Sequence, residues 1–245
     1  MNKYLVALIF VLIGGGAVVL TGAVLNKLAV YQQPLHAQAQ GSASGPSGTV
    51  KHVSIALQTF PQSPDSLPQW EAEHHYKLIR PAGVPVIDKH LDWVTYGPTA
   101  NIVVPANSEV TITITNYDSG GSLLNDFYAN VRGTINNQVT VNGQTATHVA
   151  DDNVSHTFTI HGDPSVQQPW LFVNVPVVKD FDNDVNAGKD NGLVPNPIVE
   201  QFSFYVGGPG HYVWQCEYPC GNYYNGFGGP MSTNGYMNGT FDVVG

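Results

Sequence analysis

Apolar and polar positions alternate with a period of two through most of the chain after residue 50. The runs at 53–57 and 110–114 are the clearest, and Asn142-Gly143 follows a third. Successive side chains of a strand point to opposite faces, so this pattern predicts half-buried strands, and Asn-Gly predicts a hairpin turn. One short helix is predicted at 69–80. Gly, Pro and Asn turns between short strands predict an all-β sandwich, with further strands at 154–160, 171–177, 198–206, 211–216 and 239–244.

The N-terminal segment has a different pattern. Tyr4 to Leu25 contains 22 residues without a charge, which as a helix would extend roughly 33 Å and cross a bilayer. A cleaved signal peptide usually has a shorter apolar run of about 7–15 residues. We therefore expect one retained transmembrane helix within an anchor at 1–32. A Gly/Ser-rich flexible linker is predicted at 33–50, before a single domain at 51–245.

Charge limits the possible partners. The chain has 9 Lys and Arg against 18 Asp and Glu, for a net charge of −9, so nothing predicts nucleic-acid binding. The scarcity of basic residues in the large domain favours an N-terminus inside the cell and a domain outside it. We thus expect a single-pass protein of the cell membrane with an extracytoplasmic C-terminal domain.

An acidic stretch at 179–197 begins with the spacing of a calcium loop at Asp180, Asp182 and Asp184. A calcium loop needs glycine at its sixth position and a bidentate glutamate at its twelfth. Val185 and Asn191 occupy these positions, so the stretch is predicted to be a solvated acidic loop.

The sulfur-containing residues are concentrated near the C-terminus. Cys216 and Cys220 are the only cysteines, and Met231 and Met237 are the only methionines besides Met1. Thiolate and thioether sulfur are the soft donors that copper prefers. The window 216–237 is therefore a candidate copper site, although it contains no histidine.

Strand periodicity selects the nitrogen donor. In the strand ending at Cys216, His211 lies on the face opposite Trp214 and Cys216, which makes His211 a poor ligand candidate. In the strand at 154–160, His156 shares the apolar face, whereas His161 lies with the threonines. His156 is therefore the first-choice imidazole, and His161 can reach the site only if a bulge shifts the register.

These segments resemble a known family. The motifs are His156-Thr-Phe-Thr-Ile, Pro209-Gly-x-Tyr-x-Trp-x-Cys216-x-x-x-Cys220-Gly, and Met237-x-Gly-Thr-Phe-x-Val. Together they are similar to the cupredoxin superfamily, and within it to the CuA domain of cytochrome c oxidase subunit II. The resemblance implies a Greek-key β-sandwich that binds copper. Carried over by position, it implies the ligands His156, Cys216, Cys220, the backbone carbonyl of Glu217, and the thioether of Met237.

The chain departs from this pattern at one ligand. The family has a second histidine four residues after the second cysteine, where this chain has Tyr224. Met231 or a non-neighbouring histidine can replace it, the site can be mononuclear, or the metal can be lost.

Three functions follow from these alternatives. The first is electron transfer through copper, in a domain that is or resembles subunit II of a respiratory haem-copper oxidase. The second is a copper-free cupredoxin fold with a Cys216–Cys220 disulfide, serving as a structural or assembly subunit of a quinol oxidase-type complex. The third is a copper carrier. Membrane and respiratory-complex subunits are the expected partners in the first two.

Overall fold

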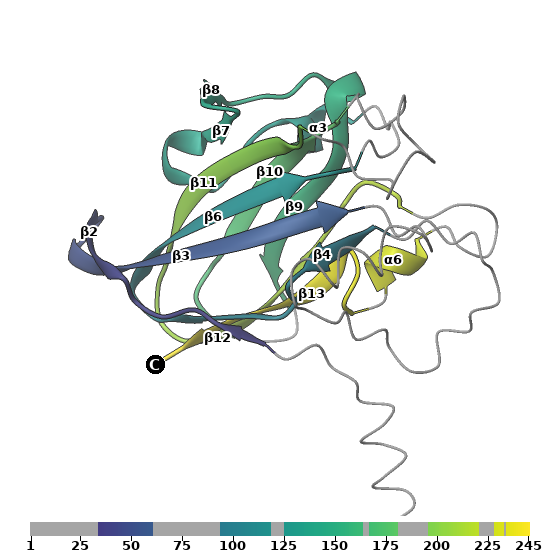
Figure 1. Ribbon diagram of the computed structural model, residues 1–245. Coiled ribbons are helices and arrows are strands. Elements are labelled where there is room, and N and C mark those ends of the chain that lie inside the picture. The colour runs from purple at the N-terminus through teal and green to yellow at the C-terminus, as the bar shows by residue number, and fades with distance from the viewer. Residues whose placement is uncertain are drawn as a thin grey trace, which may run out of the picture.

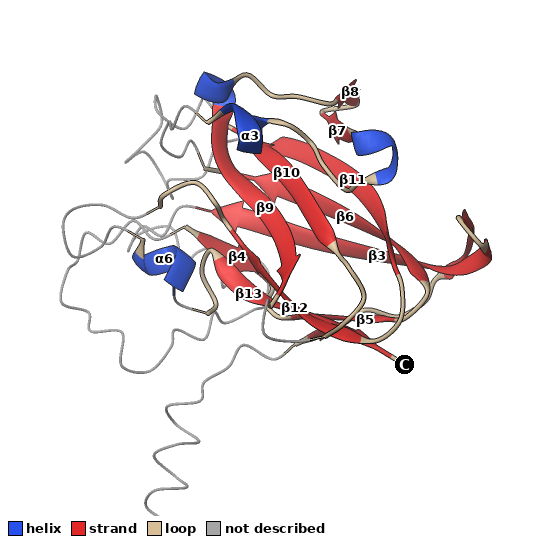
Figure 2. Ribbon diagram, turned by 180° about the vertical axis from the view of Figure 1, so that it is seen from behind, coloured by secondary structure: helices blue, strands red, loops and turns tan. Residues whose placement is uncertain are grey.

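A computed structural model describes residues 34–60, 94–118, 125–163, 167–180, 196–220, 228–232 and 234–245. They form two mixed β-sheets packed face to face, which confirms the predicted all-β sandwich (Figures 1 and 2). The first sheet has the order β1-β5-β13-β12-β9-β10. Its strands are β1 (Leu35–His36), β5 (Ile102–Pro105), β9 (Val154–Gly162), β10 (Phe172–Val178), β12 (Gly210–Gln215) and β13 (Asn238–Val244).

The second sheet has the order β2-β3-β6-β11-β7-β8, and β4 pairs with β3 outside this path. The parallel pairs are β3 with β6, and β5 with both β1 and β13; all other neighbours are antiparallel. The strands are β2 (Gly41–Gly45), β3 (Gly48–Phe60), β4 (Thr95–Gly97), β6 (Ser108–Asn116), β7 (Val139–Val141), β8 (Gln144–Ala146) and β11 (Ile198–Val206).

Short helical turns connect the strands: α3 (Asp126–Ala129), η1 (Ile135–Asn137), η2 (Asp151–Asn153) and α6 (Gly229–Ser232). The predicted hairpin is confirmed, because Asn142 and Gly143 join β7 to β8 with φ values of 46° and 83°. Such left-handed angles are typical of a type I′ turn.

The period-two pattern explains how the core forms. Alternate residues of β6 and β11 are buried, and the side chains of both sheets meet between them. In the middle, the rings of Phe158 and Trp214 stack at 4.6 Å, and Tyr96 lies edge-on to Trp214 at 4.7 Å. Such aromatic pairs contribute about 0.5–1.5 kcal/mol beyond the burial of their surface.

The predicted linker at 33–50 is wrong for the residues that the structure describes. Gly41–Gly45 forms β2 and pairs with the start of β3 through a hairpin at Pro46-Ser47, and Leu35–His36 pairs with β5. Ladder hydrogen bonds join backbone groups, so a Gly/Ser-rich segment can add an edge strand without apolar side chains. The sandwich therefore includes residues from Leu35 onward.

Among the described residues, no helix has the length and apolar character to cross a bilayer. The predicted transmembrane helix at 4–25, the predicted helix at 69–80 and most of the acidic stretch, 181–195, lie outside the described residues.

Candidate metal centre

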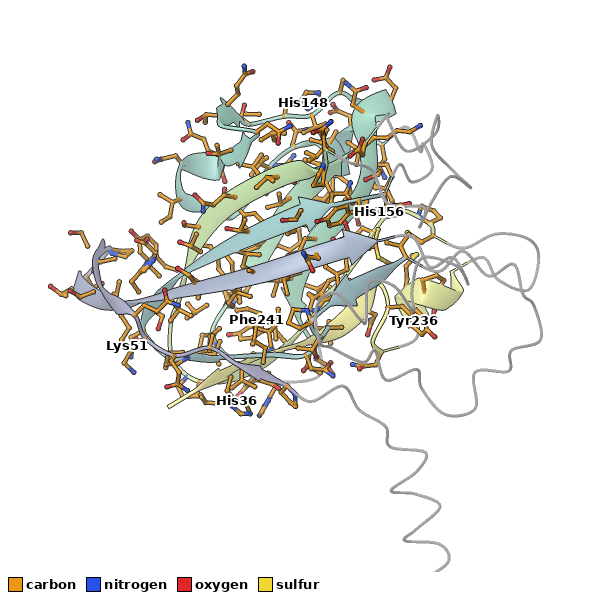
Figure 3. The ribbon with its side chains drawn as sticks, viewed as in Figure 1. His36, Lys51, His148, His156, Tyr236 and Phe241 are labelled. Atoms are coloured by element: carbon orange, nitrogen blue, oxygen red, sulfur yellow. The ribbon has the colours of Figure 1, made fainter. Side chains whose placement is uncertain are left out.

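Two neighbouring strands of the first sheet bring the predicted donors together. Cys216 directly follows β12, and His156 is the third residue of β9. The two strands are antiparallel, with Gln215 opposite Thr159 in the middle of β9, so Cys216 continues toward the beginning of β9, where His156 lies. Figure 3 shows His156 at the same end of the sandwich as α6. A loop of three residues, 217–219, then returns Cys220 to this position.

The three side chains form one cluster. Nδ1 of His156 lies 3.2 Å from Sγ of Cys220 and 3.8 Å from Sγ of Cys216, and the two sulfurs are 3.4 Å apart. The exposed fractions are 2% for His156, 0% for Cys216 and 7% for Cys220. The structure thus places the predicted imidazole against both predicted sulfurs, inside the protein.

Asp118 completes the environment of the imidazole and was missed in the sequence. Its Oδ2 lies 2.6 Å from Nε2 of His156, the ring nitrogen that faces away from the sulfurs. Asn116 fixes this aspartate, because its Nδ2 donates to the Asp118 carbonyl and its Oδ1 accepts from the Asp118 N–H. Asp118 lies two residues after the end of β6. This position of an acidic residue at a strand end was the signal in the sequence that could have marked it as part of a site.

Backbone groups also hold the sulfurs. The N–H of Thr157 donates to Sγ of Cys216 at 3.3 Å. The carbonyl of Tyr218 lies 3.2 Å from both sulfurs and accepts a hydrogen bond from a sulfur that carries a proton. The Cys220 thiol also lies within hydrogen-bond distance of Sγ of Cys216. Each donor atom therefore has partners that fix its direction before a ligand arrives.

The charges in the metal-free cluster follow from these contacts. Burial opposes the charge on His156, but hydrogen bonds with Asp118 and Cys216 prevail and raise its pKa to about 10. Burial likewise opposes the Cys216 thiolate, yet hydrogen bonds from Cys220 and His156 lower the Cys216 pKa well below its usual value. The neighbouring Cys216 thiolate and burial raise the pKa of Cys220. Without metal, these contacts thus favour a thiolate at Cys216, a thiol at Cys220 and a charged imidazole at His156.

The two methionines occupy different positions. Sδ of Met231, in α6, lies 3.1 Å from the backbone nitrogen of Cys220. Met237 is fully buried, and its backbone carbonyl accepts a hydrogen bond from the N–H of Cys216. The thioether of Met231 therefore lies against the cysteine loop.

Glu217 was predicted to contribute its backbone carbonyl, and that role stays a prediction. Its side chain is directed elsewhere, with Oε1 lying 3.8 Å from Nε2 of His161. The carbonyl that lies against the sulfurs is that of Tyr218. Tyr224 lies outside the described residues.

The histidine assignment by strand face is confirmed for His211. Its side chain is 82% exposed and pairs with Asp242 at 2.9 Å, on the outside of β12. His161 is partly exposed and faces Glu217.

The disulfide alternative is not formed in this structure, where both cysteines are free. Their sulfurs face the same imidazole instead of being joined.

The donor set fits a soft or borderline metal ion. All three ligand atoms lie within 4.8 Å of one another. Their separations of 3.2–3.8 Å are below about 4.6 Å, the widest spacing of two donors on one ion at bond lengths near 2.0–2.3 Å. A ligating histidine usually donates its second ring N–H to a carboxylate, as Asp118 provides here. Two thiolates, an imidazole and a thioether are the donors expected for copper.

In comparisons with known proteins, no family model and no curated protein sequence matches this chain.

Proposed function

We propose that this protein is a copper-binding electron-transfer domain, with His156, Cys216 and Cys220 as ligands and a methionine thioether beside them. One observation carries the proposal: Nδ1 of His156 faces both sulfurs while Nε2 is held by Asp118 at 2.6 Å. This is the arrangement of a ligating imidazole whose tautomer and direction are fixed by a carboxylate.

The chain's residues would keep the ligand positions nearly constant. Copper bound here would supply a one-electron couple, Cu(I)/Cu(II). The cysteines are held by the Thr157 N–H and the Tyr218 carbonyl, and His156 is held by Asp118. Ligands fixed by a β scaffold need little rearrangement when the charge on a metal changes. The buried position also excludes water from the thiolates.

The burial of the cluster favours electron transfer over the copper-carrier alternative. A carrier must exchange its ion with partners through accessible ligands, whereas Cys216 and His156 are 0% and 2% exposed. An electron can cross a thin layer of protein, but an ion cannot leave without an opening.

The proposed setting is a respiratory membrane. The resemblance to the CuA domain and the uncharged segment at 4–25 together support a cupredoxin-like domain anchored outside the cell membrane. In this setting the domain acts as, or like, subunit II of a haem-copper oxidase. The domain would relay electrons, and the reduction of oxygen would occur in a partner subunit.

A copper titration of the reduced full-length chain tests the proposal. Wild-type protein should bind copper tightly and develop thiolate-to-copper absorption in the visible range. His156→Gln should lose most of this absorption, and the matched variant His211→Gln should keep it, because His211 is exposed on the outer face of β12. Equal spectra for the two variants, or no absorption in wild type, would refute the proposal.

A further inference from the structure

A second group of possible ligands lies outside the copper cluster. Asp126, His148 and Asp151 each place a ligand atom within 4.8 Å of the other two. They come from three segments: the first turn of α3, the stretch after β8, and the first turn of η2. Figure 3 shows His148 at the top of the molecule, the end where Figure 1 places α3.

The backbone holds these three segments together. Val149 N–H donates to the Ala129 carbonyl at 2.9 Å, and Val131 N–H donates to the Thr147 carbonyl at 2.9 Å. Asn130 and His148 face each other across this short ladder. Main-chain pairing therefore places His148 beside α3.

The only basic side chain in this group is the imidazole of His148, which is also one of the three possible ligands. Within the part of the chain that the structure describes, no Lys or Arg forms an ion pair with Asp126 or Asp151. Arg132 lies instead over the ring of Phe127 at 4.7 Å from its centroid. Two carboxylates held this close repel each other, and a bound cation would remove the repulsion.

We propose that Asp126, His148 and Asp151 bind a divalent cation that prefers nitrogen and oxygen ligands, with water completing its coordination. One imidazole with two carboxylates suits Mn²⁺ and similar first-row ions, whereas soft Cu(I) prefers sulfur. Donors that share such an ion lie at most about 4.4 Å apart, and the exposed carboxylate of Asp126 can rotate by the few tenths of an ångström required. This proposal is independent of the copper function.

The site also adjoins the wall of the copper cluster. Asn125, which caps α3, lies one residue before Asp126, and its carbonyl accepts from the Tyr218 hydroxyl at 3.5 Å. Tyr218 is the residue whose carbonyl faces both sulfurs. A cation at the outer site would therefore stabilise α3, against which the cysteine loop rests.

Titration of the full-length chain with Mn²⁺, followed by the electron paramagnetic resonance signal of the free ion, tests this inference. Thiols are poor ligands for Mn²⁺, so the copper cluster should not contribute. One ion should bind per chain and raise the melting temperature. His148→Gln and Asp151→Asn should each weaken Mn²⁺ binding at least about tenfold. Removing a residue that only hydrogen-bonds to a metal ligand already lowers metal affinity by about tenfold or more.

Asp152→Asn is the matched control, because Asp152 is an acidic neighbour in η2 that lies outside the three-donor group. It should bind Mn²⁺ within about twofold of wild type. Equal weakening by Asp151→Asn and Asp152→Asn would indicate a general attraction of charge and overturn the proposal. So would the absence of Mn²⁺ binding to folded wild-type protein.

Discussion

Asp118 holds Nε2 of His156 at 2.6 Å, on the side of the ring opposite the two cysteine sulfurs. Asp118→Asn removes this charge and leaves the size of the side chain almost unchanged. We expect copper affinity to fall by about 10–100-fold, as is typical for outer partners of ligating histidines. Competition with a copper chelator measures this change.

Asp242→Asn is the control for Asp118→Asn. Asp242 pairs with His211 at 2.9 Å, so the same kind of pair is broken, but at an exposed position on the first sheet. Copper affinity should be unchanged. A loss as large as that of Asp118→Asn would show that the effect is not specific to the imidazole in the cluster.

The two methionines should have different roles, with Met231 as a copper ligand and Met237 as a core residue. Met231→Leu removes the thioether beside Cys220 and should shift the copper reduction potential by about 59 mV or more. For a one-electron couple, this equals a tenfold change in the affinity for Cu(I) relative to Cu(II). Met237→Leu should leave the potential in place and lower the free energy of unfolding by less than about 1.5 kcal/mol, as for other volume-conserving core changes. Voltammetry and chemical unfolding measure the two effects. The reverse assignment would make Met237 the ligand, as the resemblance implies.

Glu200 should make stability depend on pH. It is fully buried in β11, and burial raises its pKa from 4.5 to about 8, although a hydrogen bond from Val178 opposes the rise. The native state therefore binds more protons than the unfolded state between these values. The free energy of unfolding should fall as pH rises through this window, by at most about 1.4 kcal/mol per pH unit from this group.

Glu200→Gln isolates this contribution, because the amide stays neutral and can still accept from Val178 N–H. Urea unfolding between pH 4.5 and 8 should give a flatter profile for the variant than for wild type. The pKa of His156 is raised to about 10, so in both proteins His156 makes the free energy of unfolding decline as pH rises above about 6.5, the pKa of an unfolded histidine. The difference between the wild-type and variant profiles therefore reports on Glu200. Parallel profiles would contradict the assignment.

Gly239 should be intolerant of a side chain. A Cβ at this position would lie 1.8 Å from the carbonyl oxygen of Ala100 and 2.6 Å from Nε1 of Trp214. These two atoms form a hydrogen bond at 2.6 Å. Gly239→Ala should destabilise the fold by about 1–3 kcal/mol or more. Gly41→Ala, where nothing lies within 4 Å, should change stability by less than about 0.5 kcal/mol.

The sequence predicted the sandwich well because strand burial follows local alternation. The predicted strand at 198–206 matches β11 fully, and the hairpin at Asn142-Gly143 was recognisable from two residues. The linker prediction was wrong because the pairing of β2 uses backbone groups that composition does not reveal. Buried Glu200 was not singled out, since a polar residue in a strand is ordinarily assigned to the solvent face.

Strand alternation also made part of the donor cluster predictable. His156 was selected because it shares the face of Phe158 and Ile160, and the structure places its ring against both sulfurs. The sequence shows Asp118 only as a polar residue just after a strand, because its contact with His156 arises from the packing of segments 38 residues apart. Non-local partners of this kind leave no periodic signal.

X-ray absorption at the copper edge of the copper-loaded full-length chain tests the central claim most directly. The account predicts that copper is coordinated by sulfur from Cys216 and Cys220 together with imidazole nitrogen, and that His156→Gln removes the imidazole contribution. A copper environment of nitrogen and oxygen alone, or an imidazole contribution unchanged in His156→Gln, would contradict it.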